Sequence, residues 1–158
     1  MPMHYFLEQD LLALEESIKD AERRVKESIK EIGESCREGA ETFHDNFGYE
    51  EGTRNANMWS ARLRELHDIM AGAVLFTPEK SGDTVAIGRI VTITDADSGE
   101  TMTLQIGSYM TIAPRKKDVE SISYTSPMAI VLLGAKVNDI KTGGVGGKKR
   151  RFKIIEIK

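Results

Sequence analysis

The sequence predicts an α+β protein, in which an N-terminal antiparallel coiled-coil hairpin is followed by a small antiparallel β domain with one short helix. Apolar residues first recur every three or four positions, as on one face of a helix, and then every second position, as in strands. The two parts also differ in charge, because residues 1–75 carry a net −7 and residues 76–158 a net +4. We therefore expect a coiled coil at 1–75, a linker at 76–83 and a second domain at 84–158.

The first helix is predicted from a run without Pro or Gly between Met3 and Ile32. Its apolar positions form one stripe, and mixed Glu, Lys and Arg residues fill the positions between them. The stripe consists of Leu7, Leu11, Leu14, Ile18, Ala21, Val25, Ile29, Ile32 and Cys36. The first glycine, Gly33, is weakly unfavourable in a helix but does not end this pattern.

A second stripe alternates steps of three and four, as in the heptad seam of a coiled coil. It consists of Tyr49, Gly52, Ala56, Trp59, Leu63, Leu66, Met70 and Ala73. Two such stripes with a short break between them predict an antiparallel hairpin that projects roughly 35–40 Å, with its tip at residues 42–48. A dimerisation coiled coil or a plain two-helix spacer would give the same pattern.

The second domain is predicted from β-rich runs that are separated by turn residues. The segment "FTPEKSGD" (76–83) indicates a linker because it contains Pro and Gly. "PMAIVLLG" (127–134) indicates a short helix with Pro at its first position. Strands are expected at 84–95, 100–108, 121–126 and 151–158, with Gly99 in the turn between the first two.

The segment "TGGVGGKKRRF" (142–152) combines four glycines with four consecutive basic residues, 148–151. It is not a phosphate-binding loop, because no Lys-Ser/Thr pair and no helix follow the glycines. A flexible hairpin turn with basic flanks is the simpler interpretation, and electrostatic contact with an acidic partner or a nucleic acid is the alternative. The basic loop "PRKKD" (114–118) is interpreted in the same way.

Composition excludes several classes of protein. No stretch reaches the roughly 18 apolar residues of a membrane span, and "MPMHYFLEQDLL" lacks the basic start of a signal peptide. Cys36 is the only cysteine, so no internal disulfide forms, and the three scattered histidines give no zinc-binding spacing. No Ser-His-Asp or Cys-His arrangement is visible. We expect a reduced, cytoplasmic protein that is not an enzyme by itself.

The predicted tip, "ETFHDNFGYEEG" (41–52), carries more carboxylates than a turn needs: Glu41, Asp45, Glu50 and Glu51. In a purely structural interpretation, Asp45 and Asn46 cap the second helix while Phe43 and Phe47 close the end of the hairpin core. In a functional interpretation, the rod carries its carboxylates to a divalent cation inside another macromolecule. Mg²⁺ prefers oxygen ligands and often takes only one or two protein carboxylates.

The two domains together resemble the Gre family of bacterial transcription elongation factors. "VAIGRIVTITDADSGETMTLQI" is similar to the opening strands of the family's C-terminal domain. "ISYTSPMAIVLLGAKVNDI" is similar to its Ile-Ser-x-x-Ser-Pro-x-(Ala/Gly)-x-x-Leu-Leu-Gly segment. The matching residues of that segment are Ser126, Pro127, Ala129, Leu132, Leu133 and Gly134. The resemblance implies an N-terminal coiled coil and a C-terminal FKBP-like domain.

The resemblance also implies a partner, bacterial RNA polymerase. The C-terminal domain would dock on the rim of the polymerase secondary channel through Ser126, Pro127 and Met128, with Thr125 beside them. The coiled coil would enter the channel, where its tip would hold a second Mg²⁺ and a water that cut backtracked RNA. The protein would then act as a monomer with no cofactor of its own and no membrane contact. It would meet the nascent RNA only indirectly.

At the tip the family pattern reads Gly-Asp-Leu-x-Glu-Asn-Ala-Glu-Tyr, and residues 41–49 follow it in part. Asn46 and Tyr49 agree with the pattern, and Phe43 replaces an aliphatic residue. With Thr42, these residues are the expected supports of the tip. Thr42 stands where the family has Asp, and its hydroxyl is a far weaker Mg²⁺ ligand than a carboxylate.

Asp45 stands where the family has Glu, and it is the expected catalytic and Mg²⁺-binding residue. Glu41 is the second catalytic candidate, although on a helix it is turned by about 100° from position 42. Two activities therefore remain open: support of transcript cleavage, and inhibition or regulation from the same channel. An FKBP-like prolyl isomerase or chaperone is a third interpretation. Its aromatic-lined pocket would have to come from few and scattered residues, Phe76, Tyr109, Tyr124 and Phe152.

Overall fold

The computed structural model describes residues 2–38 and 47–158. The chain divides into two compact units: Leu12–Gly72 forms one, and Met1–Leu11 together with Ala73–Lys158 forms the other. The residues expected for the coiled coil, 1–75, are therefore shared between the two units. Within the described part of the chain, no helix is both long enough and apolar enough to cross a membrane.

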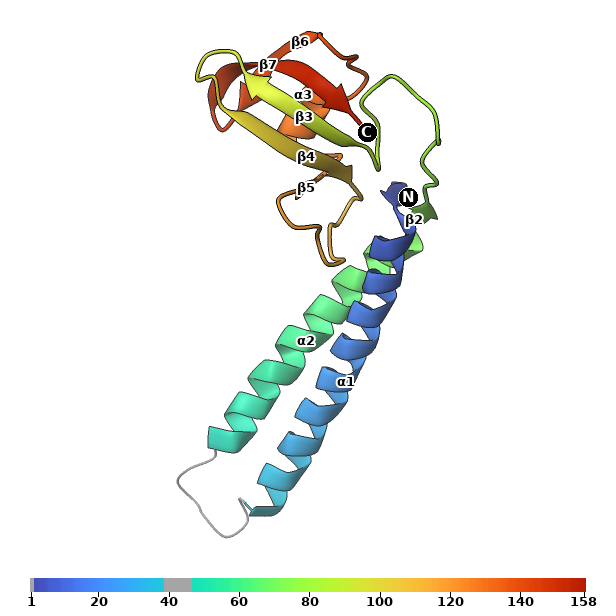
Figure 1. Ribbon diagram of the computed structural model, residues 1–158. Coiled ribbons are helices and arrows are strands. Elements are labelled where there is room, and N and C mark those ends of the chain that lie inside the picture. Colours follow the sequence, from blue (N-terminus) through green and yellow to red (C-terminus); the bar gives the residue numbers. More distant parts are fainter. Residues whose placement is uncertain (1, 39–46) are drawn as a thin grey trace. The chain divides into compact units, whose positions relative to one another are not determined.

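The helical unit is the predicted antiparallel hairpin. Helix α1 spans Glu8–Glu38 and helix α2 spans Phe47–Ala71, and the two run side by side (Figure 1). Gly33 lies within α1, as the stripe predicts. The antiparallel direction is visible in the contacts, since Gly52 near the start of α2 packs on Ile32 of α1.

The seam between the helices follows the predicted stripe only in part. Leu14, Ile18 and Ala21 are buried, but Ile29 is 58% exposed and Cys36 is also exposed. The predicted seam positions Ile29 and Cys36 are therefore wrong. Buried Ser28 takes the place of Ile29. The contact line keeps the three-residue heptad step from Val25 to Ser28, whereas the apolar stripe takes a step of four to Ile29 and leaves it.

The other unit is built around a five-stranded sheet with the order β5-β4-β3-β7-β6. Three of its four strand pairs are antiparallel, and β4 pairs with β5 in parallel. The predicted α+β class with a mostly antiparallel sheet is confirmed. The strands are β3 Ile90–Asp95, β4 Thr101–Gly107, β5 Glu120–Ser123, β6 Ile140–Val145 and β7 Lys148–Ile157.

The bounds of several strands differ from the sequence prediction, as β5 ends at Ser123 and not at residue 126. The strand expected from residue 84 begins only at Ile90, because Gly88 adopts a positive φ of 89° and turns the chain just before it. Strand β6 was not foreseen, since its sequence IKTGGV contains two glycines, which are depleted in strands. The expected turn at the glycine cluster is confirmed, with Gly146 and Gly147 both at positive φ between β6 and β7.

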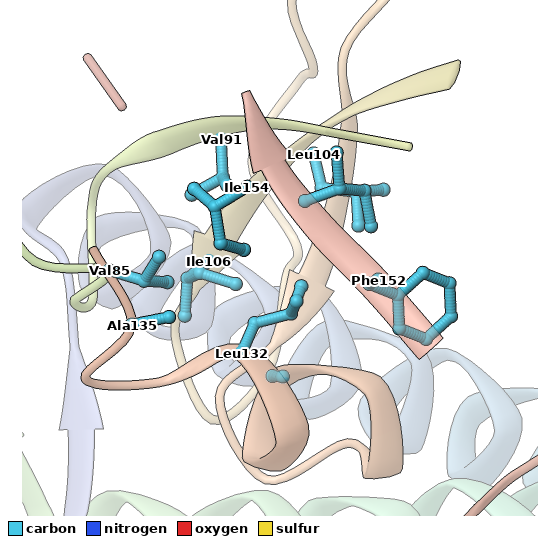
Figure 2. Packing of buried hydrophobic residues seen from close by; sticks show 10 residues of the cluster. Val85, Val91, Leu104, Ile106, Leu132, Ala135, Phe152 and Ile154 are labelled. Carbon is cyan, nitrogen blue, oxygen red and sulfur yellow. The ribbon is translucent and has the colours of Figure 1, made fainter. Parts of the chain in front are cut away.

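Helix α3, Pro127–Leu132, covers one face of the sheet (Figure 1). The alternating residues of the strands point toward it and form one hydrophobic core (Figure 2). The buried members of this core are Val85, Val91, Ile93, Leu104, Ile106, Ala129, Leu132, Ala135, Phe152 and Ile154.

The N-terminal residues belong to the β unit. Strand β1, His4–Phe6, pairs in parallel with β2, Ala73–Leu75. Phe6 is fully buried, and the backbone N–H of Tyr109 donates to the carbonyl of Tyr5 at 2.9 Å. These contacts place the segment "MHYFL" (3–7) on the second domain.

Candidate functional site

The Ser-Pro segment of the β unit forms the start of α3. Ser126 has extended backbone angles (φ −67°, ψ 151°), and its hydroxyl accepts a hydrogen bond from the N–H of Ala129 at 3.3 Å. This is the geometry of a helix N-cap, and Pro127 follows at the first helical position, where its missing N–H costs nothing. The turn is therefore specified by Ser126 and Pro127 themselves.

The residues before the cap hold this turn in place. The Ser123 hydroxyl donates to the carbonyl of Tyr109 at 3.0 Å and lies 2.8 Å from the Thr125 hydroxyl. The N–H of Ser126 donates to the Ser123 carbonyl at 3.0 Å. Thr125 and Pro127 are exposed at the surface of this turn, while Met128 is half-buried. The structure thus brings together all four residues that the sequence assigned to docking.

A cavity of about 390 Å³ opens beside this turn. Apart from the carboxylate of Glu120 and the hydroxyl of Ser126, apolar side chains dominate its lining. The lining residues are Met102, Leu104, Glu120, Ile122, Ser126, Pro127, Met128, Val145 and Gly146. Such a surface suits an apolar side chain of a partner, because a partner side chain that enters it leaves water for hydrocarbon contacts.

Sequence reasoning missed the part of this cavity that comes from the strands. Met102, Ile122 and Val145 come from β4, β5 and β6, which are far apart along the chain. The parallel β4–β5 pair places Ile122 opposite Ile106 in the sheet. The only available signal was the alternation of apolar residues in each strand, which shows the face of a side chain but not its neighbours in other strands.

The N-terminal strand supports the Ser-Pro turn from the side. The Tyr5 N–H donates to the Tyr124 hydroxyl at 3.3 Å, and the two rings lie 6.0 Å apart. His4 stacks on Tyr109 with ring centroids 3.9 Å apart. Tyr124 directly precedes Thr125, and the Tyr109 carbonyl accepts from Ser123. The first residues of the chain therefore help to fix the loop that begins at Ser123.

The far end of the helical hairpin is closely packed. A Cβ atom on Gly52 would lie 2.9 Å from Cγ1 of Ile32, and one on Gly48 would lie 2.7 Å from the Ser35 hydroxyl. Real Cβ atoms do not approach other atoms so closely, so α1 and α2 meet here because two residues lack side chains. The hairpin consequently stays narrow toward its tip.

Most residues assigned to the tip lie outside the described residues. These are Glu41, Thr42, Phe43, Asp45 and Asn46. Tyr49, the remaining one, lies in the first turns of α2 and is 40% exposed, and Phe47 at the start of α2 is 66% exposed. Among residues 2–38 and 47–158, no three His, Cys, Asp or Glu side chains are placed to hold a metal ion together.

Comparisons with known sequences point to one family. A family model described as "Transcription elongation factor, GreA/GreB, C-term" matches residues 79–158. Transcription elongation factor GreA of Thermotoga neapolitana is 29% identical over 115 residues, which cover 72% of this chain and 70% of that protein. Transcription inhibitor protein Gfh1 of Thermus thermophilus is 30% identical over 118 residues, or 72% of each chain.

Matches among solved structures include the crystal structure of GreA factor homolog 1 (Gfh1) of Thermus thermophilus. It is 25% identical, and the match covers 100% of this chain and 99% of that one with a TM-score of 0.45. Prokaryotic transcription elongation factor GreA/GreB from Nitrosomonas europaea matches 60% of this chain and 77% of its own at a TM-score of 0.38.

Proposed function

Because the chain belongs to the GreA/GreB family of transcription elongation factors, we propose that it binds bacterial RNA polymerase at the secondary channel and modulates elongation there. The docking turn at Ser126–Met128, with the 390 Å³ apolar cavity beside it, is the observation that carries this proposal. The exposed Pro127 and the half-buried Met128 form one border of that cavity. An apolar side chain on the rim of the channel would fill it.

The hairpin supplies the reach that this function needs. Its shorter helix, α2, has 25 residues and is therefore about 38 Å long. The close packing at Gly48 and Gly52 keeps its far end slender. In the proposed complex, the tip stands in the channel and Asp45, helped by Glu41, faces the polymerase active site.

Mg²⁺ in this complex belongs to the polymerase. The carboxylates of Asp45 and Glu41 are the hard oxygen donors that Mg²⁺ prefers, and they would share a metal whose other ligands the polymerase provides. The chain itself would contribute orientation and negative charge at this point. Hydrolysis of the RNA would remain the chemistry of the polymerase. The protein would be a cytoplasmic monomer with no cofactor of its own.

Transcript cleavage is the first candidate activity, because Asp45 places a carboxylate near the family's acidic position. Inhibition without cleavage is the second candidate. Thr42 stands where the family has Asp and so supplies no second carboxylate, and a relative at 30% identity is named a transcription inhibitor. The two candidates share the docking turn and differ only at the tip.

The test uses stalled, backtracked elongation complexes of the protein's own polymerase. For a cleavage factor we expect the wild type to produce shortened RNA. The rate of cleavage should fall about 100-fold or more in Asp45→Ala, since loss of one group that stabilises the transition state has this size of effect. Glu50→Ala, which removes an exposed carboxylate from the first turn of α2, is the matched control. Thr42→Asp should increase cleavage. Slowed synthesis without new RNA fragments in the wild type would identify the inhibitor instead.

Docking is tested separately by binding to core polymerase. Met128→Ser should weaken the affinity about 10-fold or more, because it removes a large apolar side chain from the contact. Met58→Ser changes the same residue type at an exposed position of α2 and should have no effect. Equal affinities of both variants would contradict the assigned docking turn.

The cavity also bears on the isomerase interpretation. None of its lining residues is aromatic, whereas a proline-binding pocket of the FKBP type is lined by aromatic rings. We expect no activity in a prolyl-peptide isomerisation assay.

A further inference from the structure

Strand β7 presents a row of cations on the sheet face opposite α3. Phe152 and Ile154 of this strand are buried in the core, so the residues between and before them point to the other face. These are Lys149, Arg151 and Lys153, which we call the β7 cationic row. Across the ladders, Lys149 lies opposite Gly144, Arg151 opposite Thr142, and Lys153 opposite both Thr94 and the exposed Ile140.

The row belongs to a segment whose charge opposes that of the whole chain. Residues 136–158 contain eight Lys/Arg and two Asp/Glu, a net charge of +6, whereas the chain as a whole carries −3. Arg151 pairs with the exposed Asp97 at 2.7 Å. Within residues 2–38 and 47–158, no carboxylate lies within 4 Å of the Lys149 or Lys153 ammonium group. Two cations of the row are thus left for solvent or a ligand.

Threonine hydroxyls and one exposed isoleucine, Ile140, surround the row. The hydroxyls of Thr94 and Thr101 lie 3.0 Å apart on the same face. Two residues further along these strands, the hydroxyls of Thr92 and Thr103 lie 3.2 Å apart. Gly144, beside Lys149, presents no side chain. The strand register places no aromatic residue on this face in β3, β4, β6 or β7.

We propose that the β7 cationic row, Lys149, Arg151 and Lys153, binds the phosphate backbone of double-stranded DNA. Alternate residues of a strand are about 7 Å apart, so the row offers regularly repeated positive charge to an extended polyanion. Threonine hydroxyls beside it donate hydrogen bonds to phosphate oxygens. The absence of aromatic rings from this part of the face favours a duplex over a single strand, whose bases would need stacking partners.

This surface is separate from the docking turn, because it uses the other face of the sheet. The DNA contact therefore does not depend on the proposed binding to polymerase and can be measured without it. Since no group on the row reads base edges, the contact has no sequence preference.

The experiment is a fluorescence-anisotropy titration of a short labelled duplex with the full-length chain at a series of salt concentrations. We expect a Kd of about 10⁻⁴–10⁻⁶ M at physiological salt and a slope of log K against log[salt] of about −2, as for one phosphate contact each of Lys149 and Lys153. Lys149→Gln with Lys153→Gln should weaken binding about 10-fold or more and make the slope shallower by about 2.

A variant with the opposite sign tests the same surface. Asp97→Asn releases Arg151 from its exposed ion pair, so duplex binding should become tighter and the slope steeper. Lys116→Gln with Lys117→Gln removes the same charge from an exposed loop of the same unit and should leave the affinity within about twofold. Unchanged melting temperatures would show that all these variants are folded.

Four outcomes would overturn the proposal. One is the absence of measurable duplex binding by the wild type, and another is an equal loss in the loop control. A third is equal or tighter binding of an unstructured single strand of the same length. The fourth is saturable binding of polyglutamate while the duplex stays unbound, which would assign the row to an acidic protein.

Discussion

Asp10 shows how one residue acquires a role that is not visible from its neighbours in the chain. It lies between Gln9 and Leu11 in the first turn of α1, where an acidic residue is favourable in any helix. In the structure it is buried, and it accepts hydrogen bonds from the Ser108 hydroxyl at 2.6 Å and from the N–H groups of Ile112 and Ala113 at 2.9 Å each. The Ser108 hydroxyl in turn accepts from the Leu7 N–H at 2.8 Å.

Replacing Asp10 with Ala should therefore destabilise the protein by about 2–4 kcal/mol, because three donors would lose their common acceptor inside the protein. Urea denaturation measures this loss. Asp68→Ala, an exposed aspartate of α2, is the control and should change the free energy of unfolding by less than about 0.5 kcal/mol. A similar, small effect of both variants would contradict the role given to Asp10.

Asp95 is the residue whose ionisation links stability to pH. The Arg150 guanidinium bonds its carboxylate at 2.7 Å, and this bond, with those from the N–H groups of Asp97 and Ser98, holds the pKa of Asp95 below its usual range. A lowered folded-state pKa stabilises the fold above the unfolded-state pKa of about 3.9, and this stabilisation is lost as the pH falls toward the folded-state value.

Arg150→Gln should raise the pKa of Asp95 toward its unfolded-state value, so the variant should be less stable than the wild type at neutral pH but should lose less stability as the pH falls. Melting temperatures measured between neutral pH and about pH 2 report this shift. Arg151→Gln is the matched control, because its partner Asp97 is exposed. It should change the loss of stability in acid less than Arg150→Gln does. An unchanged loss of stability in acid in Arg150→Gln would disprove the link.

At the scale of elements, the helical hairpin depends on glycines that the heptad pattern treats as ordinary seam positions. Gly52 falls on the predicted stripe, and the structure shows that α1 passes directly over it, with Ser28 and Ile32 against its backbone. Gly33, by contrast, has no atom within 4 Å of the position of a Cβ. A side chain at position 52 would therefore clash with α1, whereas position 33 has room for one.

Gly52→Leu should push the helices apart and cost about 1–3 kcal/mol, as overpacking of a tight contact does. Gly33→Ala should stabilise the hairpin by about 0.5–1 kcal/mol, because alanine is the better helix former and the position is open. Thermal unfolding followed by circular dichroism at the helix band measures both. Stabilisation by Gly52→Leu would show that the helices are not in contact there.

At the scale of the whole molecule, the first residues of the chain complete the β unit. Strand β1 pairs with β2, and the Phe76 N–H donates to the carbonyl of Phe6 at 2.7 Å. The β unit therefore includes residues from both ends of the sequence, with the helical unit inserted between them.

Phe6→Ala should lower the stability by about 3–5 kcal/mol, because it empties a fully buried aromatic site. Met3→Ala, at a position that is 63% exposed, should be close to neutral. The free energies come from denaturant titrations that follow the near-ultraviolet signal of the tyrosines. If Phe6→Ala unfolded no earlier than Met3→Ala, the N-terminal strand would not be part of the folded unit.

Much of the fold and the Ser-Pro turn could be predicted from the sequence, because the signals for them are local. Ser126 and Pro127 specify a helix start by their own chemistry, and the glycines at 146 and 147 specify a turn. Strand β6 could not be predicted, since its glycines are tolerated only through its pairing with β7. The strand residues of the cavity share no sequence signal, because their proximity arises only when β4, β5 and β6 assemble.

The sequence by itself determined the two helices, the class of the β domain and the position of the Ser-Pro turn, because period, caps and turn residues act over a few neighbouring positions. Only the tertiary structure decided that Ser28 replaces Ile29 in the seam, that residues up to Leu11 belong to the β unit, and that Lys149, Arg151 and Lys153 share one open face. These features depend on contacts between distant segments, and such contacts form through packing and strand register, which local patterns do not contain.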